Sequence, residues 1–224
     1  MTVLRVETFG SGGAEPYERA LRFDDEVLYL RDARSPHAAP SFSMDLSRWN
    51  DDADASDLST LSAATGAVLD IGCGPGRMVK AAMDRGLAAL GIDVSPAAVQ
   101  IAVSAGLSVL RRSVFERLPR EGAWQTALLL DGNIGIGGDP VDLLRRCREL
   151  LAPDGALVVE THPDRTRDHA YEGTVVDIRG HQSAAFPWAE LGREALEQKA
   201  SLAGFAAGQS WEADERFFSR LAAT

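Results

Sequence analysis

The sequence has few cysteines, few lysines and no long apolar run. Cys73 and Cys147 are too few for a disulfide framework or a cysteine-based metal site, so we expect reduced thiols and no metal. No apolar segment approaches the roughly 18 residues of a membrane-spanning helix. The first ten residues lack the cationic start and the apolar stretch of a secretory signal, which predicts a cytoplasmic protein.

Positive charge is scarce relative to negative charge. The formal net charge is −10, and Lys80 and Lys199 are the only lysines. Such a chain repels polyanions, and no basic cluster is dense enough to offset the repulsion, so nucleic acid and anionic membranes are poor partners. A small neutral or cationic molecule is the better expectation for a ligand. The sequence carries no signal for an oligomeric state.

The length of 224 residues and the 45% hydrophobic content are typical of one globular domain with an extension. Composition changes near residue 67, which predicts an N-terminal extension or lid over 1–66 and a main domain over 67–224. Turn residues and apolar spacing predict three elements in the extension. These are a helix over 15–23, a β-ribbon formed by 26–32 and 41–49, and a short helix that ends at Gly66.

From Ala67 onward, short apolar runs alternate with helical periodicity, which is the pattern of a parallel sheet wrapped by helices. Ser95 and Asp139 each precede a proline, the pairing that begins a helix with a side-chain cap. The sequence therefore predicts an α/β fold with helices on both faces of a mostly parallel sheet. The predicted strands are 67–72, 89–93, 107–113, 126–131 and 156–161, and a late helix covers 191–203.

The most informative segment is VLDIGCGPGR at 68–77, where a strand turns sharply into a helix. Gly72, Gly74 and Gly76 permit a positive φ and let a ligand lie directly against the backbone. In an open α/β sheet this turn lies at the carboxyl edge of the strands, where ligands usually bind. Taken alone, such a bend is often only a tight turn. Here it favours a nucleoside-containing cofactor.

Two cofactor classes compete for this bend, and the spacing separates them. A dinucleotide fingerprint needs G-x-G-x-x-G beneath a pyrophosphate, whereas Arg77 stands where the third glycine would fall. Asp70, inside the strand before the bend, would repel a pyrophosphate but suits the ammonium group of a methionine moiety. Charge therefore favours S-adenosylmethionine over a nicotinamide dinucleotide.

Asp93 is the second element of the predicted site, at the end of the second strand. A carboxylate there can accept hydrogen bonds from both hydroxyls of a ribose, each worth roughly 1.5 to 3 kcal/mol. The alternative is a helix-capping or surface carboxylate. A ribose contact supports a nucleoside in either cofactor class.

VLDIGCGPGR followed by GIDVS resembles the first two signature segments of class I S-adenosylmethionine-dependent methyltransferases, and the resemblance covers about residues 67–161. It implies a Rossmann-like three-layer sandwich with a seven-stranded, mostly parallel sheet whose last strand is antiparallel. It also implies that Asp70, Gly72, Cys73 and Gly74 surround the methionine part of the cofactor. By the same resemblance Asp93 holds the ribose, and Val94 flanks the adenine.

Two later segments extend this resemblance. After the third strand the family commonly has an acidic residue that meets the adenine amino group, whereas Ser113 occupies that place here, which leaves the contact to the backbone of Val114. LLLDGNIG at 128–135 resembles the segment after the fourth strand, whose end faces both cofactor and acceptor. This implies that Asp131, Gly132 and Asn133 lie at the reaction centre. Alternatively, the glycines of 132–140 form only a mobile loop.

Several aromatic and histidine side chains are candidates for the lid and for the acceptor pocket. Trp49 and Tyr17 could fold over the cofactor and acceptor, or could anchor the extension to the core. His162 follows the fifth strand and is the candidate general base, because the histidine side chain in general suits proton transfer near neutral pH. The alternative is a surface loop histidine. His169, Tyr171 and Trp188 are further candidates for the acceptor pocket.

The predicted reaction is transfer of the methyl group of S-adenosylmethionine to a small-molecule O, N or C nucleophile, with specialised metabolism as a setting suggested by analogy. The protein mainly has to align two molecules, and a base is required only when the acceptor must lose a proton. Two alternatives remain at this stage. One is an NAD(P)-dependent oxidoreductase, and the other is a non-catalytic binding protein that retains the cofactor fold.

Overall fold

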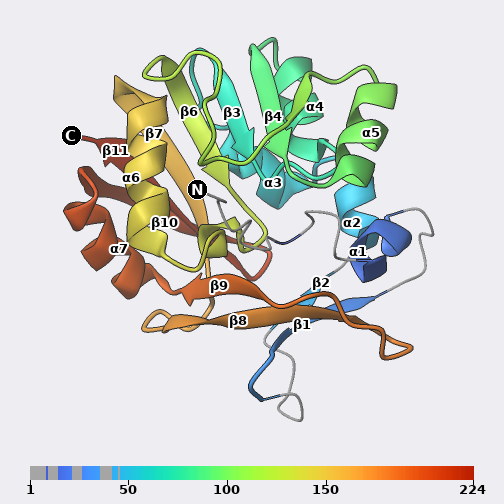
Figure 1. Cartoon of the computed structure of the whole chain (residues 1–224). Helices are drawn as coiled ribbons and strands as arrows, with labels where there is room; N and C mark the ends of the chain where they lie inside the picture. Colours follow the sequence, from blue (N-terminus) through green and yellow to red (C-terminus); the bar gives the residue numbers. More distant parts are fainter. Residues whose placement is uncertain (1–8, 10–14, 22–26, 36–41, 45) are drawn as a thin grey trace, which may run out of the picture.

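A seven-stranded sheet forms the centre of the computed structural model, which describes residues 9, 15–21, 27–35, 42–44 and 46–224 (Figure 1). Its strand order is β10-β11-β7-β6-β3-β4-β5. The five strands from β7 to β5 in this order are parallel to one another, whereas β11 pairs antiparallel with both β7 and β10. This arrangement confirms the predicted fold, including the antiparallel last strand. The strands are β3 (Val68–Ile71), β4 (Ala89–Asp93), β5 (Val109–Arg111), β6 (Trp124–Leu129), β7 (Leu151–Thr161), β10 (Phe205–Ala213) and β11 (Arg216–Ala223).

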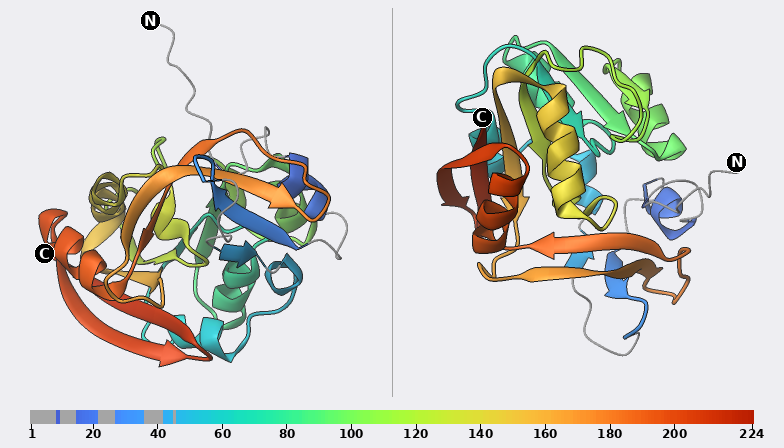
Figure 2. Two further views of the ribbon diagram at one scale, coloured as in Figure 1. Left: turned by 90° about the horizontal axis from the view of Figure 1, so that it is seen from below. Right: turned by 60° about the vertical axis from the view of Figure 1, so that its left-hand side comes forward.

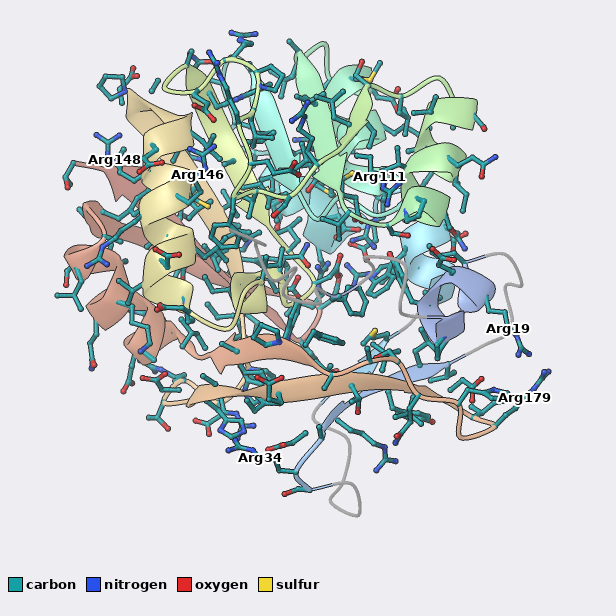
Figure 3. The ribbon with its side chains drawn as sticks, viewed as in Figure 1. Arg19, Arg34, Arg111, Arg146, Arg148 and Arg179 are labelled. Carbon is teal, nitrogen blue, oxygen red and sulfur yellow. The ribbon has the colours of Figure 1, made fainter. Side chains whose placement is uncertain are left out.

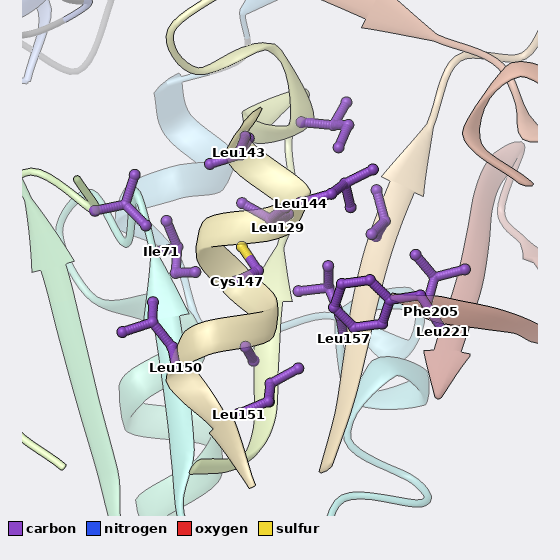
Figure 4. Close-up of a cluster of buried hydrophobic side chains, with 14 of the residues drawn as sticks. Ile71, Leu129, Leu143, Leu144, Cys147, Leu150, Leu151, Leu157, Phe205 and Leu221 are labelled. Carbon is purple, nitrogen blue, oxygen red and sulfur yellow. The ribbon is translucent and has the colours of Figure 1, made fainter. Parts of the chain in front are cut away.

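Helices cover both faces of this sheet. The side chains of successive strand residues point to opposite faces, so each strand contributes to both. Leu69 and Ile71 of β3 belong to the cluster beneath α6 (Pro140–Leu150) and α7 (Arg193–Leu202), shown in Figure 4. Val68 packs on the opposite face, against α3 (Ala55–Thr60) and α4 (Arg77–Asp84). A fifth helix, α5 (Pro96–Ser104), contacts β4 and β5. The result is three layers, as Figure 2 shows from two further directions.

A second, smaller sheet runs across one end of the first, along the bottom of Figure 1. Its strand order is β2-β1-β8-β9, and every neighbouring pair is antiparallel. The predicted β-ribbon is present as β1 (Leu28–Asp32) and β2 (Phe42–Met44). The ribbon continues into β8 (Asp168–Asp177) and β9 (Phe186–Leu191), which the sequence did not predict. The small sheet thus joins chain segments from both ends of the sequence.

The N-terminal elements are shorter than predicted. The first helix, α1, covers Glu15–Ala20, and the end of its predicted span lies outside the described residues. The prediction of a strand over 41–49 is wrong beyond Met44, because α2 (Leu46–Asn50) follows at once. Leu46 is buried and Trp49 is partly buried, and their i, i+3 spacing suits one helical turn rather than a strand.

Among the described residues, no helix is both long and apolar enough to cross a membrane. Arg19 on α1, Arg34 after β1 and Arg148 on α6 lie at widely separated places in Figure 3.

Candidate active site

A cavity of about 260 Å³ lies between the carboxyl edge of the seven-stranded sheet and the small sheet. We call its two sides the cradle and the roof. The cradle is made by lining residues that follow strands of the large sheet, in the ranges 70–75, 92–94, 112–114 and 130–134. The roof is made by the lining residues Phe9, Tyr17, Leu30, Met44 and 187–191.

Most of the predicted site residues line this cavity. On the cradle these are Asp70, Gly72, Cys73, Gly74, Asp93, Val94, Ser113, Val114, Asp131, Gly132 and Asn133. From other segments they are Tyr17, Trp49, His162 and Trp188. The structure thus brings together residues that the sequence separates by more than a hundred positions.

The glycine bend has the conformation that its sequence predicts. Gly72, Gly74 and Gly76 have φ values of +72°, +54° and +96°, which favour glycine. A Cβ at Gly72 would lie 2.6 Å from Nδ2 of Asn133, whereas a Cβ at Gly74 would meet nothing nearer than the Tyr17 hydroxyl at 3.8 Å. The backbone of Gly72 is therefore tightly packed, and that of Gly74 faces open space in the cavity.

Asp93 lies directly against this bend. Its carboxylate accepts hydrogen bonds from the backbone N–H of Gly74 at 2.9 Å and from that of Ser95 at 2.8 Å. Desolvation raises the pKa of Asp93, and these backbone hydrogen bonds oppose the shift. The glycine bend and Asp93 therefore converge on one cavity, as the sequence predicts.

Asp70 is buried beneath the bend with 4% of its surface exposed. Burial raises its pKa to about 7, although the Arg77 guanidinium favours the charged carboxylate and lowers the pKa. The carboxylates of Asp131 and Asp93 add to the increase. Asp70 is consequently poised to ionise near neutral pH, and a cationic ligand beside it would favour the ionised form.

A buried network of ion pairs underlies the cavity, and the sequence analysis did not predict it. Asp57 of α3 has no exposed side-chain surface and contacts Arg48 at 2.8 Å, Arg77 at 3.1 Å and Arg216 at 2.7 Å. Arg77 and Arg48 also reach Asp131, at 2.7 and 3.1 Å. These contacts tie α2 and α3 to the start of α4 and to β11.

Asp131 and Gly132 form a tight turn after β6. Both residues have a positive φ, +52° and +81°, which glycine adopts freely but which is uncommon for a residue with a side chain. The backbone N–H of Asp131 donates to Glu160 at 2.7 Å. Asn133 follows this turn and begins the 3-10 helix η1 (Asn133–Gly135). Its side-chain amide donates to the carbonyls of Ile71 at 2.9 Å and Gly72 at 3.0 Å. Asn133 thereby fixes the glycine bend, and backbone conformations like that of Asp131 are often found at functional sites.

Ser113 and Val114 form one end of the cradle. The backbone N–H of Ser113 donates to the Glu116 carboxylate at 2.8 Å, and its hydroxyl accepts from the N–H of Phe115 at 3.3 Å. The Val114 side chain is buried. Ser113 therefore has its own local partners, and both residues line the cavity without supplying a carboxylate.

His162 follows β7 and lines the cavity. Its backbone N–H donates to Leu191 at 2.8 Å, and its ring Nδ1 accepts from the backbone N–H of Asp164 at 3.0 Å. Because Nδ1 is the acceptor, the neutral ring carries its proton on Nε2. In this geometry Nε2 can donate a hydrogen bond, whereas acceptance of a proton requires the ring to rotate.

Two of the predicted acceptor residues are not among those that line the cavity. His169 stacks on Tyr171 with ring centroids 4.9 Å apart, and its Nε2 lies 3.9 Å from Asp32. Tyr171 is buried, and its hydroxyl donates to Glu190 at 2.8 Å. Both side chains are engaged within the small sheet. Glu190, which does line the cavity, was missed because an isolated glutamate in a strand forms no motif.

The sheet order, the glycine bend and the acid after the second strand together define the Rossmann-like methyltransferase class. The methyltransferase-domain family profile matches residues 48–206, which is more than half of the chain. The chain belongs to this family and is a methyltransferase.

Solved structures support the fold assignment. The chain is similar to an S-adenosylmethionine-dependent methyltransferase from Bacteroides fragilis, in complex with S-adenosyl-L-homocysteine, with a TM-score of 0.77, 20% identity, and coverage of 99% of this chain and 100% of that one. It is also similar to the 1,6-didemethyltoxoflavin N1-methyltransferase of Burkholderia thailandensis, with a TM-score of 0.59, 18% identity, and coverage of 79% and 80%. The CcbJ methyltransferase of Streptomyces caelestis has a TM-score of 0.56 and 17% identity, with coverage of 75% and 87%. No curated protein sequence matches the chain significantly.

The cofactor of this family is S-adenosylmethionine, and the residues of the cavity fit it. Six acidic residues and three arginines line the cavity among the described residues, so the lining is net acidic. Such a lining suits a cationic cofactor and opposes the pyrophosphate of a dinucleotide. The family assignment and this charge balance exclude the NAD(P)-dependent oxidoreductase. The family assignment also decides against a non-catalytic binding protein.

Proposed function

We propose that this enzyme transfers the methyl group of S-adenosylmethionine to an O, N or C nucleophile of a small molecule. The observation that carries the proposal is the meeting of the glycine bend and Asp93, joined by a 2.9 Å hydrogen bond, at the wall of a single cavity. Ligands bind at this edge of open α/β sheets because the strand-to-helix turns expose backbone groups there.

Each part of the cradle has a proposed role toward the cofactor. Asp93 accepts hydrogen bonds from the ribose hydroxyls, since a carboxylate oxygen can accept more than the one backbone donor it has here. Asp70, with Gly72, Cys73 and Gly74, receives the methionine ammonium. The backbone at Ser113 and Val114, with the Val94 side chain, surrounds the adenine.

The chemistry is divided between the cofactor and the chain. When bound, S-adenosylmethionine supplies a methyl carbon that its sulfonium charge already activates. The chain's own residues hold and orient the two molecules, which can lower the barrier by roughly 7 to 11 kcal/mol. Asp131, Gly132 and Asn133 shape the wall between the cradle and the acceptor.

His162 is the proposed general base for an acceptor that must lose a proton. The ring must then rotate so that it no longer accepts at Nδ1 from Asp164, because its Nε2 carries the proton in the present geometry. An acceptor with a free lone pair needs no base, and His162 would then only donate a hydrogen bond.

We further propose that residues 1–66 act as the lid of this site. Tyr17 and Trp49 line the cavity with ring centroids 6.0 Å apart, and β1 supplies Leu30 to the roof. Trp49 also lies beside Arg48, which the ion-pair network ties to Asp57 and Asp131. The lid is thus attached to the cradle by charge as well as by apolar packing.

A small-molecule acceptor is supported by the size of the cavity, about 260 Å³, and by the small sheet that forms its roof. The similar Burkholderia enzyme was solved with bound 1,6-didemethyltoxoflavin, a small molecule. By this analogy, specialised metabolism is the setting we propose.

Two measurements test the proposed function. In calorimetric titrations we expect S-adenosylhomocysteine to bind with one site per chain and NADH to give no heat of binding. The reverse result would contradict the proposal. The enzyme is then incubated with methyl-labelled S-adenosylmethionine and a cell extract separated by ultrafiltration. After the labelled cofactor is removed by chromatography, we expect label in other compounds of the filtrate, whereas label confined to protein or nucleic acid would exclude a small-molecule acceptor.

A further inference from the structure

The roof of the cavity has a composition unlike that of the cradle. Alternate residues of β9 share one face of the small sheet, so Trp188 and Glu190 face the same way. The register pairs Trp188 with Tyr171, and Leu30 of β1 with Val175 of β8. This face carries large apolar side chains, and Glu190 is the one charged side chain among the described residues of the roof.

Aromatic rings dominate this apolar surface. The ring centroid of Phe9 lies 4.7 Å from that of Tyr17 and 5.8 Å from that of Trp188. Trp188 and Phe186 meet edge to face, with centroids 5.8 Å apart and an interplanar angle of 86°. Phe9, Tyr17 and Trp188 line the cavity, whereas Phe186 does not, and aromatic rings at a binding surface favour a planar aromatic ligand over a saturated one of similar size.

Glu190 gives the roof one polar point of fixed geometry. Its side chain is buried, with the residue 9% exposed. Its Oε2 accepts from the Arg167 guanidinium at 2.9 and 2.7 Å, and its Oε1 accepts from the Tyr171 hydroxyl at 2.8 Å. A carboxylate oxygen has two lone pairs, so Oε1 can accept one further hydrogen bond.

The charge of Glu190 is already balanced by Arg167. A cationic acceptor would therefore gain little from Glu190, because the ion pair leaves the roof close to neutral. An anionic acceptor would be repelled by the net acidic cradle. An uncharged N–H or O–H donor is the group that matches the remaining capacity of Oε1.

We propose that the roof is the acceptor site, and that it takes a flat, uncharged aromatic or heteroaromatic molecule with an N–H or O–H group directed at Glu190. This inference rests on the proposed function, because it assigns the acceptor of the same reaction. Tyr171 and Arg167 are positioning residues that hold the Glu190 carboxylate.

The experiment compares four probes of similar size by calorimetry, in the free enzyme and in enzyme saturated with S-adenosylhomocysteine. The probes are 2-naphthol, 2-methoxynaphthalene, decahydro-2-naphthol and 2-naphthoate, all at neutral pH. We expect 2-naphthol to bind about fivefold or more tightly than each of the others, since each lacks the donor, lacks the planar ring or carries a negative charge. Equal or tighter binding of 2-naphthoate or decahydro-2-naphthol would overturn the inference.

Two matched variants locate the polar contact. In Glu190→Gln, Arg167 attracts the amide oxygen, so the amide NH2 faces the ligand and the preference for 2-naphthol over 2-methoxynaphthalene should fall about fivefold. Glu172→Gln, an exposed position on β8 of the same sheet, should leave the preference unchanged. An unchanged preference in folded Glu190→Gln would contradict the role of Glu190.

The outcomes distinguish failure of the proposed function from failure of the proposed acceptor site. Failure of S-adenosylhomocysteine to bind would contradict the proposed function, and the probe ranking in the free enzyme would still decide the acceptor site. Normal binding of S-adenosylhomocysteine with no preference among the four probes would overturn the acceptor site alone. The melting temperature and the S-adenosylhomocysteine affinity of Glu190→Gln report whether the variant keeps its fold.

Discussion

The two sides of the cavity differ in how they are built. The cradle is polar, and its backbone turns follow consecutive strands of one sheet, with Asp93 bonded to Gly74 only 19 positions away. The roof is apolar and antiparallel, and it pairs Leu30 with Val175, far apart in the sequence. The cradle, which we propose binds the cofactor, is therefore encoded by a local sequence motif. The roof, which we propose binds the acceptor, depends on segments that are far apart in the sequence.

The largest expected effect tests whether the ion-pair network beneath the cradle holds the extension to the main domain. Asp57→Ala removes the carboxylate that contacts Arg48, Arg77 and Arg216, and it leaves buried positive charge without a partner. We expect the free energy of unfolding to fall by about 3 to 5 kcal/mol. Chemical denaturation measures this, with Asp52→Ala as control because Asp52 is 82% exposed. Equal midpoints for the two variants would show that the network does not hold the extension.

A smaller effect separates strain from packing in the glycine bend. Gly72→Ala and Gly86→Ala both place alanine at a positive φ, +72° and +77°, which costs about 1 to 2 kcal/mol. At Gly72 the new Cβ would also collide with Asn133, whereas at Gly86 it meets no atom within 4 Å. We expect only Gly72→Ala to weaken S-adenosylhomocysteine binding, by about 1 kcal/mol or more. Equal affinities in calorimetry would remove Asn133 from the support of the cradle.

A third test is the pH dependence that Asp70 gives to the free energy of unfolding. Its pKa is about 7 in the folded protein and about 3.9 when unfolded, so between these values the folded state holds more protons. The free energy of unfolding should therefore fall as pH rises from about 4 to 7, and its dependence on Asp70 should level off above that range. Denaturation of Asp70→Asn across the same range should lack this part of the decline. Parallel curves for the two proteins would contradict the assignment.

Sequence reasoning succeeded where structure depends on local chemistry. The strand at 89–93, the proline-marked helix starts after Ser95 and Asp139, and the convergence of the glycine bend with Asp93 were all predicted. Each depends on residues close in sequence or on the regular geometry of parallel strands. The placement of Asp131 and Asn133 beside the bend followed from the family resemblance.

The small sheet and its contacts could not be predicted in the same way. β1 pairs with β8, which is distant in the sequence, and the sequence of neither strand indicates which strand it pairs with. The register of β8 and β9 engages His169 and Tyr171 within the sheet and leaves Glu190 at the cavity. The contacts of Asp57 with three arginines likewise depend on the packing of four separate elements.

The most direct test of the central claim is the affinity for S-adenosylhomocysteine in Asp93→Ala, measured by calorimetry beside Asp154→Ala, which replaces an exposed aspartate near the start of β7. We expect Asp93→Ala to weaken binding by an amount on the order of 2 kcal/mol or more, because the ribose hydroxyls lose a charged acceptor. Asp154→Ala should bind like the wild type. Wild-type affinity in a folded Asp93→Ala protein would contradict the claim that this acid and the glycine bend hold one adenosine.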